Sequence, residues 1–325
     1  MSTVTQTPTA PAGQSAASTP ALHIAIFLAL LAAGLLAPFM LYPVFVMKVL
    51  CFALFACAFN LLLGYGGLLS FGHAAYFGGA SYVAAHAAKV WGVTPEVSLL
   101  LGVLAAAALG LVIGSLAIRR QGIYFAMITL AFAQMVYFFS IQAPFTGGED
   151  GIQSVPRGDL FGLVSLHSDM SLYFFVLAIT LGGILLIYRI IHSPFGQVLK
   201  AIRENEPRAI SLGYRVNRYK LAVFVLSAAL AGLAGATKSM VFQLASLTDV
   251  HWSMSGEVVL MTLIGGMGTV FGPIVGATVI VTMQNYLATF GAWVTVIQGV
   301  IFVLTVLLFR EGFVGVISKW IKKPL

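Results

Sequence analysis

HSPFGQVLKAIRENEPRAISLGYRVNRYK, residues 192–220, is a polar and basic segment set between long apolar runs. Ser193 and Pro194 form an N-cap and first-turn pair, which predicts a helix through about Glu204. Asn205 offers a second N-cap, and Gly213 is well placed to end a second helix of about two turns. The segment therefore predicts two short capped helices that project from a membrane, with membrane-spanning helices on either side.

The composition of the chain is that of an integral membrane protein. Of its 325 residues 60% are hydrophobic and only 8% are charged, whereas soluble proteins carry about a quarter charged residues. Cys51 and Cys57 share one apolar run, which argues against a disulfide framework or a zinc cluster, so no metal is expected. Residues 1–20 are rich in Ser, Thr, Pro and Ala and predict a disordered N-terminal tail.

Apolar stretches long enough to cross about 30 Å of hydrocarbon predict an all-α polytopic membrane protein. The eighth stretch is short and interrupted by glycine, and the third opens on a Gly-rich turn, so the pattern fits ten transmembrane helices, or eight or nine with re-entrant segments. The ten candidate spans are residues 22–42, 44–63, 70–90, 97–118, 123–143, 171–191, 220–241, 253–267, 272–290 and 293–310.

The distribution of cations predicts the orientation, because Lys and Arg in short loops stay in the cytoplasm. The cations lie after the fourth, sixth and tenth spans, which places both termini inside, with a transmembrane domain over 21–310 and a cytoplasmic tail over 311–325. Residues 144–170 then form a periplasmic loop with more acidic than basic residues. The net charge of +7 follows from this topology, and nothing else in the sequence supports nucleic-acid binding. The cations that define the inner side, besides those of the loop 192–219, are Arg119, Arg120, Arg310, Lys319, Lys322 and Lys323.

The loop 192–219 permits two interpretations. Its apolar positions Ala209, Ile210 and Leu212, with Ala201 and Ile202 before them, form an apolar face that suits docking of a cytoplasmic protein. Alternatively, the loop is simply a solvated basic segment, or it binds lipid headgroups. The two consecutive caps favour an ordered docking element.

Four motifs resemble the LivM-type permease subunits of bacterial high-affinity branched-chain amino acid ABC transporters. They cover most of the chain after residue 20, in the order and spacing of that family. The motifs are GYGGLLSFGHAAYFGGASYVAA (64–85), TGGEDGIQSVPRGDLFGL (146–163), SPFGQVLKAIRENEPRAISLGY (193–214) and LIGGMGTVFGPIVGA (263–277).

This resemblance implies an ABC importer permease whose third motif is the coupling loop that contacts an ATP-binding subunit. It further implies two ATP-binding cassette subunits, a second homologous permease subunit and a periplasmic solute-binding protein. No GxxxxGK[ST] phosphate loop occurs, so we expect no cofactor in this chain and ATP and Mg only on the partner subunits. The resemblance assigns Gly196, Ala201, Arg203, Glu204 and Gly213 to the coupling contact, and the helix pattern adds Pro207, Ile210 and Leu212.

Further residues are candidates for the path, for an ion pair and for the outer surface. Lys238 and Glu257 are charged residues in adjacent spans and predict an ion pair. Each set also has a structural alternative. The glycines of the spans could permit tight helix packing, and the histidine could form a hydrogen bond without relaying protons. The glycines of the outer loop could serve only the geometry of a turn. The path candidates are Gly66, Gly67, Gly72, His73, Gly265, Gly266 and Gly272; those of the outer loop are Gly147, Gly148, Glu149, Asp150 and Gly151.

The favoured function is import of branched-chain or related hydrophobic amino acids across the bacterial inner membrane by alternating access. The same machinery could carry urea or a short-chain amide, because such systems resemble this family closely. A gradient-driven secondary transporter is less consistent with the sequence, because no Asp or Glu lies in the middle of a span. No residue pattern supports catalysis, so we expect a transporter subunit and no enzyme.

Overall fold

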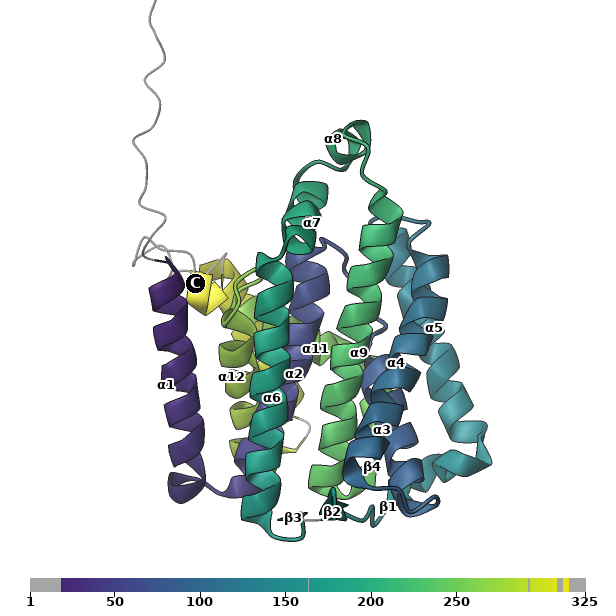
Figure 1. Ribbon diagram of the computed structural model, residues 1–325, viewed down its shortest axis with the longest axis vertical. Coiled ribbons are helices and arrows are strands. Elements are labelled where there is room, and N and C mark those ends of the chain that lie inside the picture. Colours follow the sequence, from purple (N-terminus) through teal and green to yellow (C-terminus); the bar gives the residue numbers. More distant parts are fainter. Residues whose placement is uncertain (1–18, 163, 292, 309–311, 316–325) are drawn as a thin grey trace, which may run out of the picture.

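The computed structural model describes residues 19–162, 164–291, 293–308 and 312–315. Each of the ten predicted spans corresponds to one helix in this part of the chain, and these helices lie roughly side by side (Figure 1). They are α1 (Thr19–Met40), α2 (Pro43–Asn60), α3 (His73–Lys89), α4 (Pro95–Ala117), α5 (Ile123–Gln142), α6 (Asp169–His192), α9 (Val216–Phe242), α11 (Trp252–Gly265), α12 (Gly272–Tyr286) and α13 (Trp293–Leu308).

Five of these helices are long and apolar enough to cross a membrane by length and composition: α2 with its π-helical end η1 (Leu61–Tyr65), α4, α5, α6 and α9. Shorter apolar helices occupy Ala25–Met40, Trp252–Gly265 and Trp293–Thr305. The remaining two of the ten, α3 and α12, have 17 and 15 residues and begin at glycine-rich segments. The architecture is therefore that of an all-helical polytopic membrane protein.

The short elements lie in the connections. They are the 3-10 turns η2 (Pro144–Thr146), η3 (Gly148–Asp150) and η4 (Ala288–Phe290), the helices α7 (Pro194–Glu204), α8 (Glu206–Ser211) and α10 (Leu247–Val250), and the strands β1 (Ile152–Gln153), β2 (Asp159–Leu160), β3 (Val164–Ser165) and β4 (Leu244–Ala245). Strand β1 pairs antiparallel with β4, with Ile152 opposite Ala245, and β2 pairs antiparallel with β3. The first pairing joins the connection before α6 to the one after α9.

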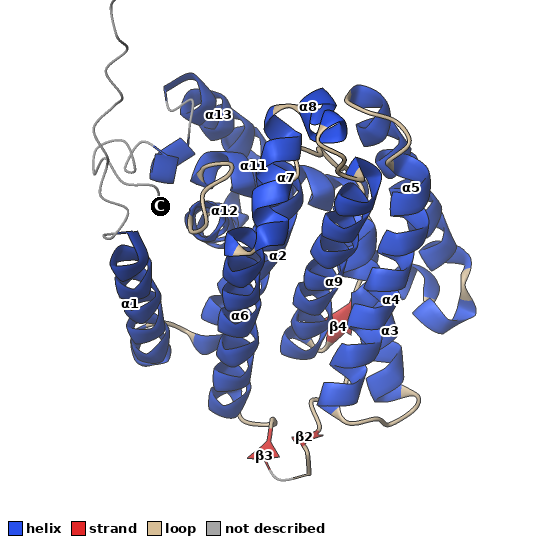
Figure 2. Ribbon diagram, turned by 45° about the horizontal axis from the view of Figure 1, so that its top comes forward, coloured by secondary structure: helices blue, strands red, loops and turns tan. Residues whose placement is uncertain are grey.

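The centre of the bundle is formed by α2 and α9, which pack against α3, α4, α11 and α12 (Figure 2). Most of α2 with η1 is buried, whereas most of α5, at the edge of the bundle, is not. Small residues permit close approach of the helices. A Cβ at Gly235 of α9 would come within 1.9 Å of the carbonyl oxygen of Phe77 in α3. The edge helices instead expose large apolar side chains such as Leu104, Met135 and Phe138, which suits contact with lipid.

The two ends of the bundle differ in structure. One end, here called the coupling end, carries α7 and α8, which extend beyond the long helices, and α1 begins at this end (Figure 1). The other end, the outer end, carries β1 to β4. Gly312 lies against Gly266 near the coupling end.

Some terminal predictions lie outside the described residues. These are the tail over residues 1–18, the cations Arg310, Lys319, Lys322 and Lys323, and the tail over 316–325. Helix α1 begins at Thr19, two residues inside the segment predicted to be disordered, because an apolar run from Ala21 onward extends the helix back to that point.

Candidate functional site

The coupling loop contains two capped helices, as its sequence predicts. Ser193 Oγ accepts a hydrogen bond from the backbone N–H of Gly196 at 3.3 Å, and Asn205 Oδ1 accepts one from Arg208 at 3.0 Å. Gly213 ends α8 with a φ of +86°. The N–H of Gly213 donates to Ile210 and that of Tyr214 to Ala209, which is the Schellman pattern. Local capping chemistry therefore determines both helices.

The predicted apolar face of this loop is divided into two parts. Ile202, Ala209 and Val216 form a buried cluster that holds α7, α8 and the start of α9 together. Ile210 and Leu212 are 58% and 69% exposed. The first group stabilises the loop, and the second group is an apolar surface at the point farthest from the bundle.

Most residues assigned to the coupling contact lie on the surface of the loop. Gly196 differs, because it is buried and a Cβ there would come within 2.2 Å of the carbonyl oxygen of Ile191. It permits close packing of α7 on the end of α6 and offers no side chain to a partner. The exposed members are Ala201, Arg203, Glu204, Pro207, Ile210, Leu212 and Gly213.

The loop is fixed to the bundle by polar contacts at its base. The buried Lys220 Nζ and the partly exposed Glu206 Oε2 form an ion pair at 2.7 Å, and Gln121 donates to the other carboxylate oxygen at 3.1 Å. Glu206 begins α8, Lys220 lies in α9 and Gln121 precedes α5. Movement of α8 would therefore displace the ends of two long helices.

Arg203 connects α7 to both glycine-rich segments. Its guanidinium donates to the carbonyl oxygen of Gly64, and Gly268 lies so close that a Cβ there would be 3.4 Å from Nη1. Gly67 has a φ of +69° and packs against the aliphatic part of Arg203. Beneath this contact is a pocket of about 410 Å³ with Arg203, Glu206 and Lys220 in its lining.

Asn60, at the end of α2, links the same two segments from inside the bundle. Its Nδ2 donates to the carbonyl oxygen of Thr269 at 2.8 Å, and its Oδ1 accepts from the N–H of Gly268 at 2.9 Å. The turn after α2 and the loop between α11 and α12, 204 positions apart at Gly64 and Gly268, are thus in direct contact. Asn60 has few polar neighbours in the sequence, and only the fold shows its role.

The remaining path candidates are packing positions. Gly72 precedes α3, and a Cβ there would be 2.9 Å from the carbonyl oxygen of Thr129. Gly265 and Gly272 approach so closely that a Cβ on the first would be 2.0 Å from the carbonyl oxygen of the second. A Cβ at Gly66 would be 2.7 Å from the carbonyl oxygen of Leu62. Gly266 has a φ of +124°, a backbone conformation that favours glycine.

His73 is fully buried and hydrogen-bonded. Its Nε2 lies 2.8 Å from Ser227 Oγ, which itself donates to the carbonyl oxygen of Ala58 at 2.6 Å. Because the serine proton is used in that bond, His73 Nε2 is the donor in the first. The rings of Phe59, Tyr76 and Phe224 surround the imidazole. This arrangement supports the hydrogen-bonding alternative, because the contacts of His73 with the described residues include no carboxylate and no amine.

The outer loop 144–170 is folded against the bundle. Gly147, Gly148 and Gly151 all have positive φ, and a Cβ at Gly151 would come within 2.2 Å of the carbonyl oxygen of Ala245. These glycines therefore serve backbone geometry beside the β1–β4 pairing. Glu149 and Asp150 are exposed at the outer end, so the acidic surface predicted for this loop is accessible.

The predicted ion pair between Lys238 and Glu257 is wrong. Lys238 Nζ pairs with Asp249 of α10 at 2.5 Å, and Glu257 accepts a hydrogen bond from Gln284 of α12 at 3.0 Å. The connection between α9 and α11 folds back as β4 and α10, which brings Asp249 to Lys238. Lys48 was not among the predicted site residues, although a lone charge within an apolar span is a signal for such a residue.

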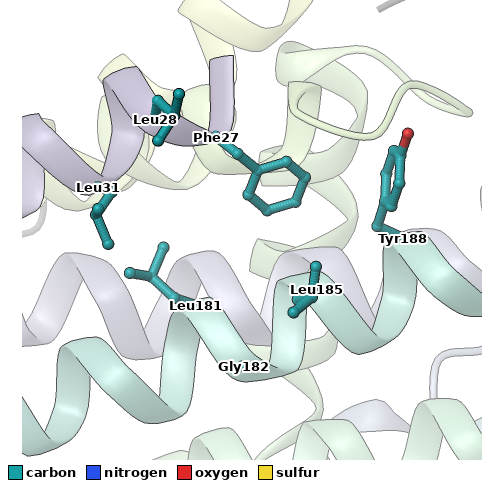
Figure 3. Close-up of a pocket in the computed structure, with 7 residues that line it drawn as sticks. All are labelled: Phe27, Leu28, Leu31, Leu181, Gly182, Leu185 and Tyr188. Atoms are coloured by element: carbon teal, nitrogen blue, oxygen red, sulfur yellow. The ribbon is translucent and has the colours of Figure 1, made fainter. Parts of the chain in front are cut away.

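A groove of about 400 Å³ on the side of the bundle has a different character. Figure 3 shows its lining, which comes from α1 and α6 and carries no charged side chain. Such a groove offers nothing to orient a polar solute and suits a lipid acyl chain. Its lining residues are Phe27, Leu28, Leu31, Leu181, Gly182, Leu185 and Tyr188.

The fold and the site define a class of protein: a multi-pass helical membrane subunit with an ordered loop that extends from one end. The family described as "Branched-chain amino acid transport system / permease component" matches residues 44–306. The chain therefore belongs to this family of transporter permeases and is a membrane subunit, not an enzyme.

Individual relatives agree with this assignment. The chain is 28% identical over 286 residues to the high-affinity branched-chain amino acid transport system permease protein LivM of Escherichia coli K12, covering 81% of this chain and 67% of that protein. It is 25% identical over 273 residues to the probable branched-chain amino acid transport permease protein LivH of Methanocaldococcus jannaschii, covering 75% and 82%. It is also 30% identical over 173 residues to the ribose import permease protein RbsC of Bacillus subtilis, covering 51% of each. No solved structure matches the chain.

Proposed function

We propose that this chain is one membrane-spanning half of an ATP-driven importer of branched-chain or related hydrophobic amino acids in the bacterial inner membrane. The observation that carries the proposal is the coupling loop, where exposed Ile210 and Leu212 lie on a loop fixed to the bundle by Arg203 and the Glu206–Lys220 pair. Family membership supports an amino acid as the substrate class.

The mechanism follows from the contacts of Arg203. When an ATP-binding subunit on α8 closes, α7 moves with it, and Arg203 transmits that displacement to Gly64 and to the neighbouring Gly268. Gly64 lies in η1 at the end of α2, and Gly268 follows α11, so the displacement reaches both of these helices. The π-helical turn η1 (Leu61–Tyr65) departs from α-helical geometry at this end of α2, as is frequent at functional sites, and is the proposed point of deformation. The proposed result is alternate opening of the two ends.

The proposed assembly contains two ATP-binding cassette subunits, a second homologous permease and a periplasmic solute-binding protein. ATP and Mg belong to the cassette subunits. The exposed acidic residues Glu149 and Asp150 on the outer loop are the proposed contact for the solute-binding protein.

The experiment that tests this function is purification of the chain from native membranes in mild detergent, followed by reconstitution with the proteins that accompany it. We expect recovery of cassette subunits and a second permease, and ATP-dependent uptake of leucine with a co-encoded solute-binding protein. A receptor that binds urea or a short-chain amide would change the substrate and keep the mechanism. Solute movement by the chain alone without ATP would instead establish a gradient-driven carrier.

A further inference from the structure

Four charged side chains from four helices gather near the outer end of the central helices. They are Lys48 of α2, Lys238 of α9, Asp249 of α10 and Glu257 of α11. Lys238 and Asp249 neutralise one another at 2.5 Å, and the Asp249 side chain is only 1% exposed. Helix α11, which carries Glu257, packs against α2, which carries Lys48. The cluster as a whole is neutral.

Lys48 and Glu257 differ from the other two because neither is neutralised by direct contact. The hydrogen-bond partner of Glu257 is the uncharged amide of Gln284. In the described part of the chain, no carboxylate lies within 4.0 Å of Lys48 Nζ. Both side chains are partly exposed. Because charges in a span are costly in lipid, two such groups of opposite sign should face water or a polar ligand.

An apolar barrier lies next to Lys48, on the side that faces the coupling end. Phe52 and Phe55 follow it on the same face of α2, one and two turns toward the coupling end. Their rings are 5.8 and 4.4 Å from that of Phe77 in α3, and all three side chains are buried. Opposite charges therefore lie at the outer side of a closed aromatic layer.

We infer that Lys48 and Glu257 form a binding site for the head group of a zwitterionic amino acid on the outer side of the aromatic layer. The Lys48 ammonium binds the substrate carboxylate, the Glu257 carboxylate binds the substrate ammonium, and the apolar side chain is directed toward Phe52. This inference rests on the proposed function and adds the residues that select the substrate. Urea and neutral amides carry neither charge. They would leave Lys48 and Glu257 unpaired and would therefore bind more weakly than a zwitterion.

The test uses the purified complex without solute-binding protein and measures competition with radiolabelled leucine. Two probes each lack one charged group: 4-methylpentanoate has no ammonium and 3-methylbutylamine has no carboxylate. In the unmodified complex we expect leucine to bind at least about tenfold more tightly than either probe, because each charged hydrogen bond contributes substantially. Glu257→Gln should abolish the preference for leucine over 4-methylpentanoate and keep the preference over 3-methylbutylamine. Lys48→Gln should abolish the preference for leucine over 3-methylbutylamine and keep the preference over 4-methylpentanoate.

Matched controls are Lys89→Gln and Glu96→Gln, which remove one charge each near the same end. These should leave both discriminations unchanged. Equal loss of both discriminations in each variant, unaltered discrimination, or no leucine binding by the unmodified complex would each overturn the inference. So would loss of the second permease subunit from either variant, because Lys48 and Glu257 would then be subunit contacts. Failure of the proposed function is distinguishable, since it appears as absent ATP-driven uptake in the unmodified complex.

Discussion

The guanidinium of a single residue, Arg203, links the coupling loop to the end of α2. It donates to the Gly64 carbonyl and lies beside Gly268, which Asn60 holds from the other side. Lys200 also reaches this end of α2, because its Nζ lies 5.7 Å from the centre of the Tyr65 ring. Arg208, by contrast, is exposed, and it contacts Asn205 through its backbone N–H.

Replacing Arg203 with alanine should therefore uncouple ATP hydrolysis from transport. A charged hydrogen bond contributes about 1.5–3 kcal/mol, so we expect Arg203→Ala to lower ATP-driven uptake by about tenfold or more. ATP hydrolysis by the assembled complex should persist. The measurement is the ratio of solute transported to ATP hydrolysed in proteoliposomes.

The control for this prediction is Arg208→Ala, which removes the same charge from the same loop and should keep the ratio. If Arg203→Ala instead released the cassette subunits, Arg203 would act in the subunit contact and would not transmit movement within the bundle.

At this scale, the sequence predicts residues whose partners are local. Ser193, Asn205 and Gly213 act on backbone groups within a few positions, so their roles follow from capping rules. Lys238 has a partner that only tertiary structure supplies, because Asp249 reaches it through the fold of β4 and α10. The link from Asn60 to Thr269 is equally invisible in the sequence.

Among the short elements, α8 has apolar residues that the bundle leaves exposed. Ala209 faces inward, whereas Ile210 and Leu212 are exposed beyond the coupling end. Such exposed apolar residues at the tip of an ordered loop are typical of a protein interface.

The double variant Ile210→Ala and Leu212→Ala should lose the cassette subunits while remaining in the membrane. Buried apolar anchors contribute more than about 1 kcal/mol each to an interface, so we expect a loss of association of about tenfold or more. Because the buried cluster of Ile202, Ala209 and Val216 is untouched, the loop should stay folded. Co-purification of cassette subunits with the variant measures the effect.

A matched pair of exposed apolar residues lies at the outer end, Phe161 and Val164, which are 71% and 49% exposed. Phe161→Ala with Val164→Ala should retain the cassette subunits. Normal co-purification and transport by the Ile210 and Leu212 variant would contradict the docking role of α8.

The sequence predicts long helices well and short connections poorly. Each apolar run produced a helix because backbone groups in lipid must be paired within the segment. Strands β1 and β4 have two residues each, and their pairing depends on where α5, α6 and α9 end. No periodic pattern of two residues could have indicated it.

In the whole molecule, α2 connects the two candidate sites. Lys48 lies in its second turn near the outer end, and Asn60 and Gly64 lie at its coupling end. The aromatic layer of Phe52, Phe55 and Phe77 separates them. Displacement of one end of α2 by Arg203 would therefore also shift the rings of this aromatic layer. This geometry makes α2 the element through which closure of a cassette subunit could open the layer.

The orientation of the whole molecule is testable by labelling engineered cysteines with a membrane-impermeant maleimide. Cys51 and Cys57 are both buried, so they should give little background. Glu149 on the outer loop and Leu212 on the coupling loop lie at opposite ends and are both exposed. If the coupling loop is cytoplasmic, Glu149→Cys should be labelled when reagent reaches only the outer side of the inner membrane, and Leu212→Cys only after that membrane is permeabilised. Labelling of both without permeabilisation, or the reverse pattern, would contradict the orientation, and a cassette subunit could then not reach α8.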